Sequence, residues 1–481
     1  MNIRIISKNV GLALMLEAAF MLLSALVSAL DGFDASFSPL LLSGILTLTV
    51  GVLPIIFVGS SQNKINTREG LMILTMAWLL TCIFGLMPFA LYGGEFSLIN
   101  ALFESVSGIT TTGATIVSDV EALPKGLLFW RSSSHFIGGL GVVVFMLVIL
   151  PSAGTVRLKM SRIEVSDISQ SNYNFRSNKL VRVVLSVYIS LMVLLVLSYL
   201  LCGMSLFDAV NHAFSAVATG GFSTHTASIG WFDSPVIEVV TALFMVASSL
   251  HFGMIYSSVA GRNLKIFRHP VVKFFLTSLL VGVVLVTVDL LATGTYTNFF
   301  EALRHAFFNV VSFGTSTGFA TEDTSVWPVF AMFLLMDFSV QCGCSGSTTG
   351  GLKSDRLWAL FTAVRVQLYK TLYPNVVVPV KYGNTAADPE QVSGIAIYAV
   401  LYFMIIIICA LVYAAVGMDF VDSFSSSVAM VGNIGPAFGS VGSLSNFDEV
   451  STVAKLVMCV EMIVGRLGLF TALTLLIRKR V

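Results

Sequence analysis

Long apolar segments recur along the whole chain, separated by short polar connections. Each segment is about 20 residues or longer, the length that an α-helix needs to cross a hydrocarbon core of about 30 Å. The pattern predicts membrane spans at residues 9–30, 38–58, 71–93, 127–150, 180–202, 234–257, 272–294, 327–369, 394–417 and 451–477. The segment 327–369 is interrupted and is predicted to be a broken span. Such a series is typical of an all-α polytopic membrane protein.

The composition excludes an ordinary soluble domain. The chain has 481 residues, a mean hydropathy of +0.90 and 11% charged residues, whereas soluble domains carry about 25% charged residues. The formal net charge of +1 gives no indication of a nucleic-acid partner. The lipid bilayer is therefore the partner that the composition predicts.

Basic residues are concentrated in alternate loops, which predicts how the chain is oriented. If both termini are cytoplasmic, the inner loops and the C-terminal tail hold Lys64, Arg68, Arg157, Lys159, Arg162, Arg176, Lys179, Arg182, Arg262, Lys265, Arg268, Lys273, Arg478, Lys479 and Arg480. The outer loops hold little positive charge beyond Lys125 and Arg131. This asymmetry follows the positive-inside rule and fits an even number of crossings. We interpret the first apolar segment as a retained span, because it is longer than the apolar core of a signal peptide.

A short apolar stretch, too brief to cross the membrane, occurs four times between pairs of spans. Each copy begins with a helix-capping residue and has a polar residue three positions later, a capping-box pattern. The caps are Ser97, Ser205, Asn298 and Asp419, and the stretches end at Gly113, Gly221, Gly318 and Gly435. The distance from cap to glycine is 16 residues in three copies and 20 in the third. The extra four residues amount to about one helical turn.

The repeat divides the chain into an N-terminal pair of spans and four span–pore-helix–span units. The predicted boundaries are 1–60 for the N-terminal pair, then 61–152, 153–268, 269–372 and 373–481 for the four repeats. We expect the four units to surround a central pore.

The loops after the short helices read TTTGAT (110–115), ATGGFST (218–224), TSTGFAT (315–321) and GNIGPAF (432–438). Irregular backbone at membrane depth must be buried or line water, so four such loops can meet on one axis. Rings of backbone carbonyls can replace the water around a monovalent cation. Glycine allows the unusual backbone angles that such rings require. No loop contains a carboxylate, which argues against a divalent-ion site.

Two other features are costly inside a membrane. The sequence QCGCSGSTTGG at 341–351 interrupts a span with small and polar residues, which an ordinary lipid-facing helix does not tolerate. Arg466 lies in the last span, and a charge at that depth usually faces a cavity or a partner. A salt bridge from Arg466 to Glu461 or Asp337 is the structural alternative. Lys353 is expected to extend its amine to the cytoplasm.

With these motifs the chain resembles the TrkH/KtrB/HKT superfamily of potassium transporters, and most of all the bacterial TrkH family. The resemblance covers the whole chain. It implies that K⁺ is the transported ion, that carbonyls around the four glycines form the selectivity filter, and that no other cofactor is bound. The implied filter residues are Thr111, Thr112, Gly113, Thr219, Gly220, Gly221, Ser316, Thr317, Gly318, Asn433, Ile434 and Gly435. Within the second loop, the 16-residue spacing favours Gly221 over Gly220.

The resemblance also implies a gate, partners and a location. In the family, an intramembrane loop blocks the pore below the filter and an arginine helps to control passage. The corresponding residues here are Gly343, Cys344, Ser345, Gly346, Ser347, Thr348, Thr349, Gly350, Gly351 and Arg466. The family further implies a homodimer in the bacterial inner membrane. Because no connection is long enough for a soluble domain, nucleotide control would need a separate cytoplasmic TrkA-type ring that binds ATP/ADP or NAD(H).

Three alternatives remain open at this point. Asn433 and Ile434 depart from the threonine-rich pattern, which suggests an asymmetric filter and a sodium-permeable transporter. Potassium uptake coupled to H⁺ or Na⁺ is compatible with the same fold. A remote alternative is an intramembrane serine protease, because Gly343-Cys344-Ser345-Gly346 matches G-x-S-G and His305 to Asn309 matches H-x-x-x-N. The fourfold repeat has no role in a protease, so the chain is predicted not to be an enzyme.

Overall fold

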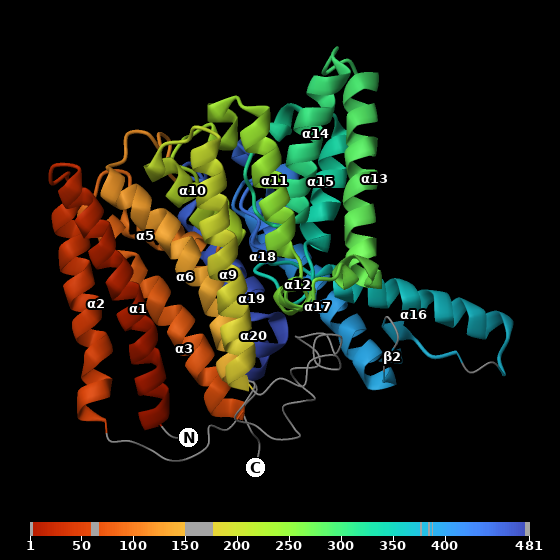
Figure 1. Ribbon diagram of the computed structural model, residues 1–481, viewed down its shortest axis with the longest axis horizontal. Helices are drawn as coiled ribbons and strands as arrows, with labels where there is room; N and C mark the ends of the chain where they lie inside the picture. The colour runs from red at the N-terminus through yellow and green to blue at the C-terminus, as the bar shows by residue number, and fades with distance from the viewer. Residues whose placement is uncertain are drawn as a thin grey trace.

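The fold is a bundle of long helices with short helices held inside it (Figure 1). The computed structural model describes residues 3–58, 67–149, 177–375, 378–382, 385–386 and 388–476. Apart from a two-residue antiparallel hairpin, β1 (Lys381–Tyr382) and β2 (Thr385–Ala386), the regular structure in this part of the chain is helical. The predicted all-α class is confirmed.

The helices follow the predicted order. The N-terminal pair is α1 (Ile3–Leu30) and α2 (Phe37–Phe57), and the next group is α3 (Thr67–Gly85), α4 (Met87–Tyr92), α5 (Leu98–Ile109) and α6 (Lys125–Ile149). The following group is α9 (Ser177–Leu201), α10 (Leu206–Ala218), α11 (Pro235–Ser249) and α12 (Phe252–Ala260). Then come α13 (Pro270–Ala292), α14 (Phe299–Gly314), α15 (Val329–Gln341) and α16 (Ser354–Leu372). The last group is α17 (Pro389–Ala415), α18 (Phe420–Gly432), α19 (Thr452–Leu467) and α20 (Leu469–Leu476). Short 3₁₀ helices occur at Ser228–Phe232, Lys265–Arg268, Thr324–Val326 and Gly439–Val441.

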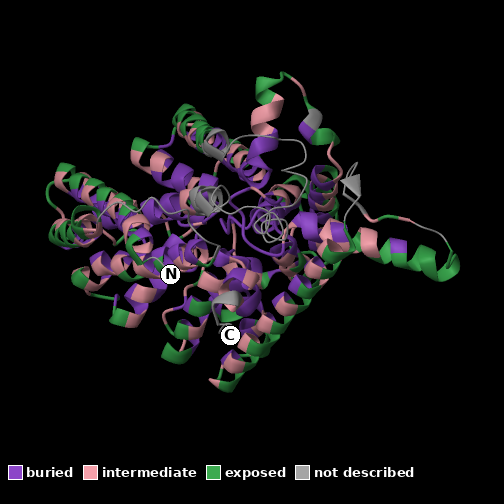
Figure 2. Cartoon of the chain, turned by 90° about the horizontal axis from the view of Figure 1, so that it is seen from below, coloured by how far each residue is buried: buried purple, intermediate pink, exposed green. Residues whose placement is uncertain are grey.

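Several described helices are long and apolar enough to cross a membrane on their own. They are Ile3–Leu30, Phe37–Phe57, Arg68–Tyr92, Arg182–Leu201, Pro270–Ala292 and Pro389–Ala415. Their outer faces carry exposed apolar side chains such as Leu194, Leu280 and Ile408, whereas the buried residues gather in the centre of the bundle (Figure 2). Exposed apolar side chains on these helices suit contact with lipid.

The segment predicted as one span at 234–257 is instead bent by 101° between α11 and α12. The prediction of a continuous helix was wrong there, because the backbone at the bend forms tertiary hydrogen bonds. Cys344 donates its backbone N–H to the Ser249 carbonyl at 2.8 Å, and Phe252 donates its N–H to the Gly346 carbonyl at 3.2 Å. Segment 341–351 thus takes the place of a helical turn.

The four short helices α5, α10, α14 and α18 begin at the four predicted caps. The side chains of Ser97, Ser205 and Asn298 accept hydrogen bonds from backbone N–H groups of the first turn, while Asp419 is the cap of α18 without such a bond. Helix α14 has 16 residues, whereas the other three have 12 or 13. The extra turn predicted for the third copy is therefore present.

Each short helix is held by the long helices around it. Helix α5 packs on α3 and α6, α10 on α6 and α9, α14 on α13 and α15, and α18 on α17 and α19. Each of these long helices belongs to the same group as its short helix or, for α6 and α10, to the group just before it in the chain. The C-terminal ends of the short helices are buried, because their last residues, such as Ile109, Ala218, Gly314 and Gly432, are shielded from solvent.

Several basic residues used for the predicted orientation lie outside the described residues. They are Lys64, Arg157, Lys159, Arg162, Arg176, Arg478, Lys479 and Arg480. Arg131 was counted as an outer-loop charge, but it lies inside α6 and its side chain is only 2% exposed. Its burial follows from an ion pair described below.

Candidate ion pathway

The four short helices end in the same backbone conformation. The residue two positions before each glycine is left-handed, with φ values of 52° at Thr111, 55° at Thr219, 51° at Ser316 and 53° at Asn433. In each case this residue donates its N–H to the carbonyl three positions back, and the next residue donates to the carbonyl five positions back. This pair of bonds defines the Schellman motif, which usually places glycine at the left-handed position. Here four polar residues occupy it.

The glycine that follows is also left-handed in every loop. Its φ is 85° at Gly113, 87° at Gly221, 79° at Gly318 and 93° at Gly435. Gly220 does not have a positive φ, so Gly221 is the residue equivalent to the other three. Among the described residues, none donates a hydrogen bond to the carbonyl oxygens of the residues just before these glycines, Thr112, Gly220, Thr317 and Ile434.

The glycines bring the four loops into a closed ring. A Cβ atom on Gly113 would overlap the carbonyl oxygen of Gly220, and one on Gly221 would overlap that of Thr317. A Cβ on Gly318 would overlap the Ile434 carbonyl, and one on Gly435 would lie 2.5 Å from the Thr112 carbonyl oxygen. Each loop therefore touches the next in chain order, and the fourth touches the first. The unbonded carbonyls lie at these contacts.

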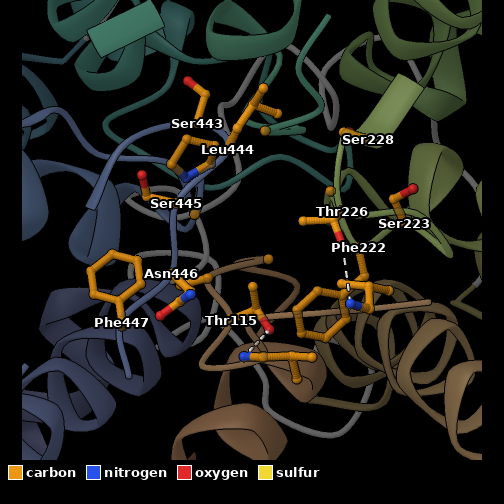
Figure 3. A pocket seen from close by; sticks show the side chains of 18 of the residues that line it. Thr115, Phe222, Ser223, Thr226, Ser228, Ser443, Leu444, Ser445, Asn446 and Phe447 are labelled. Atoms are coloured by element: carbon orange, nitrogen blue, oxygen red, sulfur yellow. Dashed lines mark hydrogen bonds between the residues drawn. The ribbon is translucent and has the colours of Figure 1, made fainter. Parts of the chain in front are cut away.

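A cleft opens onto the ring, and all four glycines line it. Its wall is rich in hydroxyl side chains from the segments that follow the first two glycines and from segment 442–447, and the side chains of Thr115, Phe222, Thr226 and Asn446 lie around it (Figure 3). The hydroxyls of Thr115 and Thr226 accept hydrogen bonds from the backbone of Val117 and Val120 at 3.1 and 3.0 Å. The cleft gives the ring access from the predicted outer side.

Side chains brace the loops from behind. The hydroxyls of Thr110 and Thr112 are 2.7 Å apart, and those of Thr315 and Thr317 are 2.8 Å apart. Asn433, which breaks the threonine pattern, donates Nδ2 to the Thr112 hydroxyl at 3.0 Å and to the Met462 carbonyl at 2.9 Å. Asn433 thus joins the fourth loop to the first loop and to α19.

A buried ion pair that was not predicted from the sequence supports the first two loops. Arg131 Nε donates to Glu104 Oε1 at 2.8 Å, and the two side chains are 2% and 0% exposed. Glu104 also accepts the Thr115 hydroxyl, and Arg131 donates to the Ser223 carbonyl at 3.3 Å and lies 4.2 Å from the Phe222 ring centroid. This pairing could not be predicted from the sequence, because Glu104 lies in α5 and its partner Arg131 lies in another helix, α6.

The mouth of the cleft has one charged network. Partial burial raises the pKa of Glu121, but hydrogen bonds from the hydroxyl and backbone N–H of Thr226 outweigh it and lower the pKa overall. The His225 ring stacks on Trp231 with centroids 3.7 Å apart and faces the carboxylates of Glu121 and Asp208, each at 3.5 Å. This network joins the outer loops of the first two repeats.

The predicted gate segment 341–351 lies against the C-terminal ends of the short helices. The Thr348 hydroxyl donates to the Val217 carbonyl at 3.1 Å, near the end of α10. The backbone N–H of Gly350 donates to the Ser316 hydroxyl at 3.0 Å, and a Cβ on Gly350 would overlap the Gly432 carbonyl. The segment therefore touches the last turn of α10 and the third and fourth loops, on the side away from the cleft.

Two cationic side chains hold this segment. Arg466 Nη1 donates to the Thr348 carbonyl at 2.7 Å, and its Nε and Nη2 are buried with no partner among the described residues. Arg466 makes no ion pair with Glu461 or Asp337 in the described part of the chain. Lys353 Nζ donates to the carbonyl and the hydroxyl of Thr349. The expectation that Lys353 extends to the cytoplasm was wrong, because its amine donates a hydrogen bond to the Thr349 carbonyl.

The protease alternative finds no support in this geometry. His305 faces Thr321 at 3.0 Å and Glu322 at 3.4 Å, whereas Ser345 donates its backbone N–H to Asp355 at 2.5 Å. The structure does not bring Ser345 and His305 together. Among the described residues, no group of three or more His, Cys, Asp or Glu side chains is arranged to hold a metal ion.

Comparisons with known proteins agree with each other. Residues 40–480 match the family model TrkH, described as a cation transport protein. The chain is 34% identical over 480 residues to the Trk system potassium uptake protein TrkH of Salmonella typhimurium, covering 99% of this chain and 98% of that protein. The corresponding protein of Escherichia coli is 33% identical with the same coverage. The crystal structure of the potassium transporter TrkH from Vibrio parahaemolyticus matches with a TM-score of 0.89, 31% identity and 99% coverage of both chains.

Proposed function

The chain belongs to the TrkH family of cation transport proteins, and from that premise we propose that it takes up potassium ions through the ring of four glycine loops. The family is one of transport proteins, as the sequence predicted, rather than of enzymes. The observation that carries the proposal is the closed ring at Gly113, Gly221, Gly318 and Gly435, with unbonded carbonyls between neighbouring loops.

The chemistry of the ring suits a monovalent cation. Carbonyl oxygens can replace an ion's water without adding fixed charge, as in potassium filters. The short helices point their C-terminal ends at the ring, and these ends carry partial negative charge. Glu104 lies close behind the first loop, but its negative charge is paired with the positive charge of Arg131. Neutral oxygen ligands therefore surround the proposed path.

We propose that segment 341–351 and Arg466 form the gate on the inner side of the ring. Support comes from the contacts of this segment with Val217, Ser316 and Gly432, and from its hydrogen bond to Arg466. A fixed positive charge there opposes the passage of a cation. Opening would require the segment to leave the helix ends and Arg466 to release Thr348.

The assembly and placement of the chain are proposed from its relatives, which are bacterial proteins of a Trk system. We propose a homodimer in the inner membrane with both termini cytoplasmic, controlled by a TrkA-type nucleotide-binding ring. Arg262 and Arg268 are exposed on the predicted inner side and could dock such a ring. Helix α16 projects from the bundle with Phe361, Leu368 and Leu372 exposed, which offers the homodimer a contact surface (Figure 1). We also propose the domain boundaries at 60, 152, 268 and 372, of which those at 60 and 152 lie outside the described residues.

One observation favours a second candidate, a sodium-permeable transporter. The fourth loop places Asn433 and Ile434 where the first loop has Thr111 and Thr112, and the Asn433 amide bonds across to Thr112. A ring that is not symmetric has fewer equivalent oxygen cages, and selectivity between K⁺ and Na⁺ depends on the number and arrangement of such oxygens. Parallel uptake measurements with the two ions separate the candidates.

The direct test is growth of a bacterium that lacks its own potassium-uptake systems on limiting potassium. The wild-type chain, expressed in the membrane, is expected to restore growth. Tracer uptake of Rb⁺ into vesicles that contain the purified protein, in competition with K⁺ or Na⁺, then identifies the transported ion. Good membrane expression without rescue or tracer uptake would rule out the proposal.

A further inference from the structure

A buried carboxyl group without a cationic partner lies behind the fourth short helix. Glu461 belongs to α19, and its side chain is 2% exposed. Its Oε1 is 2.5 Å from the Ser427 hydroxyl of α18, and its Oε2 accepts the phenol hydroxyl of Tyr413 of α17. Among the described residues, no Lys, Arg or His forms an ion pair with it.

Among the described residues, the groups packed around Glu461 from neighbouring helices carry no positive charge. The titratable side chains that face it are Tyr402, Cys409 and Tyr413 of α17, while Cys459 of α19 lies beside Tyr413 and Cys82 of α3. Helix α18 presents only the Ser427 hydroxyl, and the acidic Glu104 of α5 is paired with Arg131. An isolated anion at membrane depth is costly, so a carboxyl group in these surroundings favours its neutral form.

The hydrogen bonds around Ser427 indicate where the proton lies. A serine hydroxyl has one hydrogen to donate, and the Ser427 hydroxyl is also 3.1 Å from the Ile406 carbonyl. A carbonyl can only accept, so the single Ser427 hydrogen cannot satisfy both Ile406 and an ionised Glu461. Both contacts are hydrogen bonds when a protonated Glu461 donates to Ser427 at 2.5 Å and Ser427 donates to Ile406. Every member of the chain Tyr413–Glu461–Ser427–Ile406 is satisfied when Glu461 is protonated.

This carboxyl group is linked to the fourth loop by two short routes. Ser427 lies on α18, the helix that ends at Asn433. Met462, the residue after Glu461, accepts the Asn433 amide at 2.9 Å. We propose that Glu461 is a proton-binding site whose occupancy links α17, α18 and α19 and so keeps the fourth loop in the ring.

The functional consequence rests on the proposed potassium uptake. Loss of the proton places an uncompensated negative charge between α17, α18 and α19, and Ser427 then donates to the carboxylate instead of to Ile406. The hydrogen bond between α18 and α17 is lost, and Asn433 at the end of α18 loses its fixed position. Uptake is therefore expected to decline as Glu461 ionises on the alkaline side.

The first test detects the proton directly, without transport. Infrared spectra of the wild-type protein in lipid contain the C=O stretch of protonated carboxyl groups, and the difference from Glu461→Gln isolates the Glu461 band. Tyr413→Phe removes one hydrogen bond to this carbonyl and is expected to move the same band to higher wavenumber. Tyr199→Phe is the matched control, because it removes a buried phenol that bonds Thr241 at 2.9 Å in another span. Identical spectra for wild type, Glu461→Gln and Tyr413→Phe would overturn the proposal.

The second test measures uptake against pH. Glutamine can donate to Ser427 and accept from Tyr413 as the neutral acid does, so Glu461→Gln is expected to keep neutral-pH uptake and lose the alkaline decline. A Glu461→Gln protein with the wild-type pH profile, or with no uptake at any pH while Tyr413→Phe remains active, would contradict the link to the ring. If the wild type shows the Glu461 band but transports no potassium, the proposed function fails and the proton site stands.

Discussion

The guanidinium of Arg466 donates a hydrogen bond of 2.7 Å to the backbone carbonyl of Thr348. This single bond joins the last span to the segment that lies beneath the ring of loops. The other two guanidinium nitrogens are buried and have no partner among the described residues. A buried cation with one protein bond is only partly satisfied, which suits a contact that must form and break.

Replacement of Arg466 by glutamine is expected to raise ion flux. The change removes the positive charge and the bond to Thr348, and a hydrogen bond to a charged group contributes about 1.5–3 kcal/mol. A change of this size in the balance between closed and open states corresponds to roughly a tenfold or larger rise in flux. Rb⁺ uptake at equal protein content in vesicles measures it. Equal flux in the two proteins would remove Arg466 from the gate.

Arg466 and segment 341–351 are expected to act as one unit. A variant in which a flexible linker replaces residues 344–350 should have a higher flux even with Arg466 unchanged. Because Arg466 acts through Thr348 in this segment, adding Arg466→Gln to the linker variant should give no further rise. Fluxes that multiply in the double variant would mean that the two act separately. The variant Thr348→Ala keeps the backbone carbonyl that Arg466 needs but loses the hydroxyl bond to Val217, so it measures that contact separately.

A serine at position 113 is expected to impair uptake at limiting potassium. Gly113 has φ 85°, and an added Cβ would push against the Gly220 carbonyl of the next loop. The backbone strain alone is about 1–2 kcal/mol, and the displaced carbonyl changes the oxygen ring itself. We expect a loss of growth on limiting potassium and a smaller preference for K⁺ over Na⁺ in tracer uptake.

The variant Gly203→Ser distinguishes the effect of backbone strain from the effect of the contact between neighbouring loops. Gly203 has φ 90°, but a Cβ there would meet no atom within 4 Å. The two substitutions therefore carry similar backbone strain, and only the one at position 113 disturbs the ring. Equal uptake defects in Gly203→Ser and Gly113→Ser would show that the ring contact is not the cause.

The variant Glu104→Gln is expected to lower stability markedly. It leaves the Arg131 charge buried without a counter-ion, a change that costs about 3–5 kcal/mol. The matched control is Asp31→Asn, because Asp31 and Lys125 form a pair at 2.6 Å with side chains 35% and 53% exposed. Exposed pairs contribute about 0–1 kcal/mol. Thermal unfolding in detergent should show a clear drop in the midpoint for Glu104→Gln and little change for Asp31→Asn.

A similar drop in both variants would mean that the buried Glu104–Arg131 pair contributes no more to stability than the exposed Asp31–Lys125 pair. Loss of uptake in Glu104→Gln at temperatures well below its unfolding midpoint would show a further role in shaping the ring. That role follows from the contacts of Glu104 with Thr115 and of Arg131 with Ser223, which lie just after the first two glycines.

Local rules in the sequence predicted the units of the pathway. A capping residue and the side chains after it decide where a short helix begins, so Ser97 and Ser205 were found from the sequence alone. The extra turn of α14 followed from counting residues between Asn298 and Gly318. The glycine spacing also separated Gly221 from Gly220, because a left-handed φ at a fixed distance from a helix end is a property of the local chain.

Contacts between distant segments were decided only by the tertiary structure. The bend at Leu250 depends on hydrogen bonds from a segment almost 100 residues away, and nothing in the apolar run 234–257 shows it. The pairing of Glu104 with Arg131, and of Glu461 with Tyr413 and Ser427, required helices to be packed side by side. The sequence by itself determined the apolar segments, the caps and the four glycines, because these depend on neighbours along the chain. Which carbonyl each glycine meets was decided only when the four loops closed into a ring, because that contact depends on packing between helices.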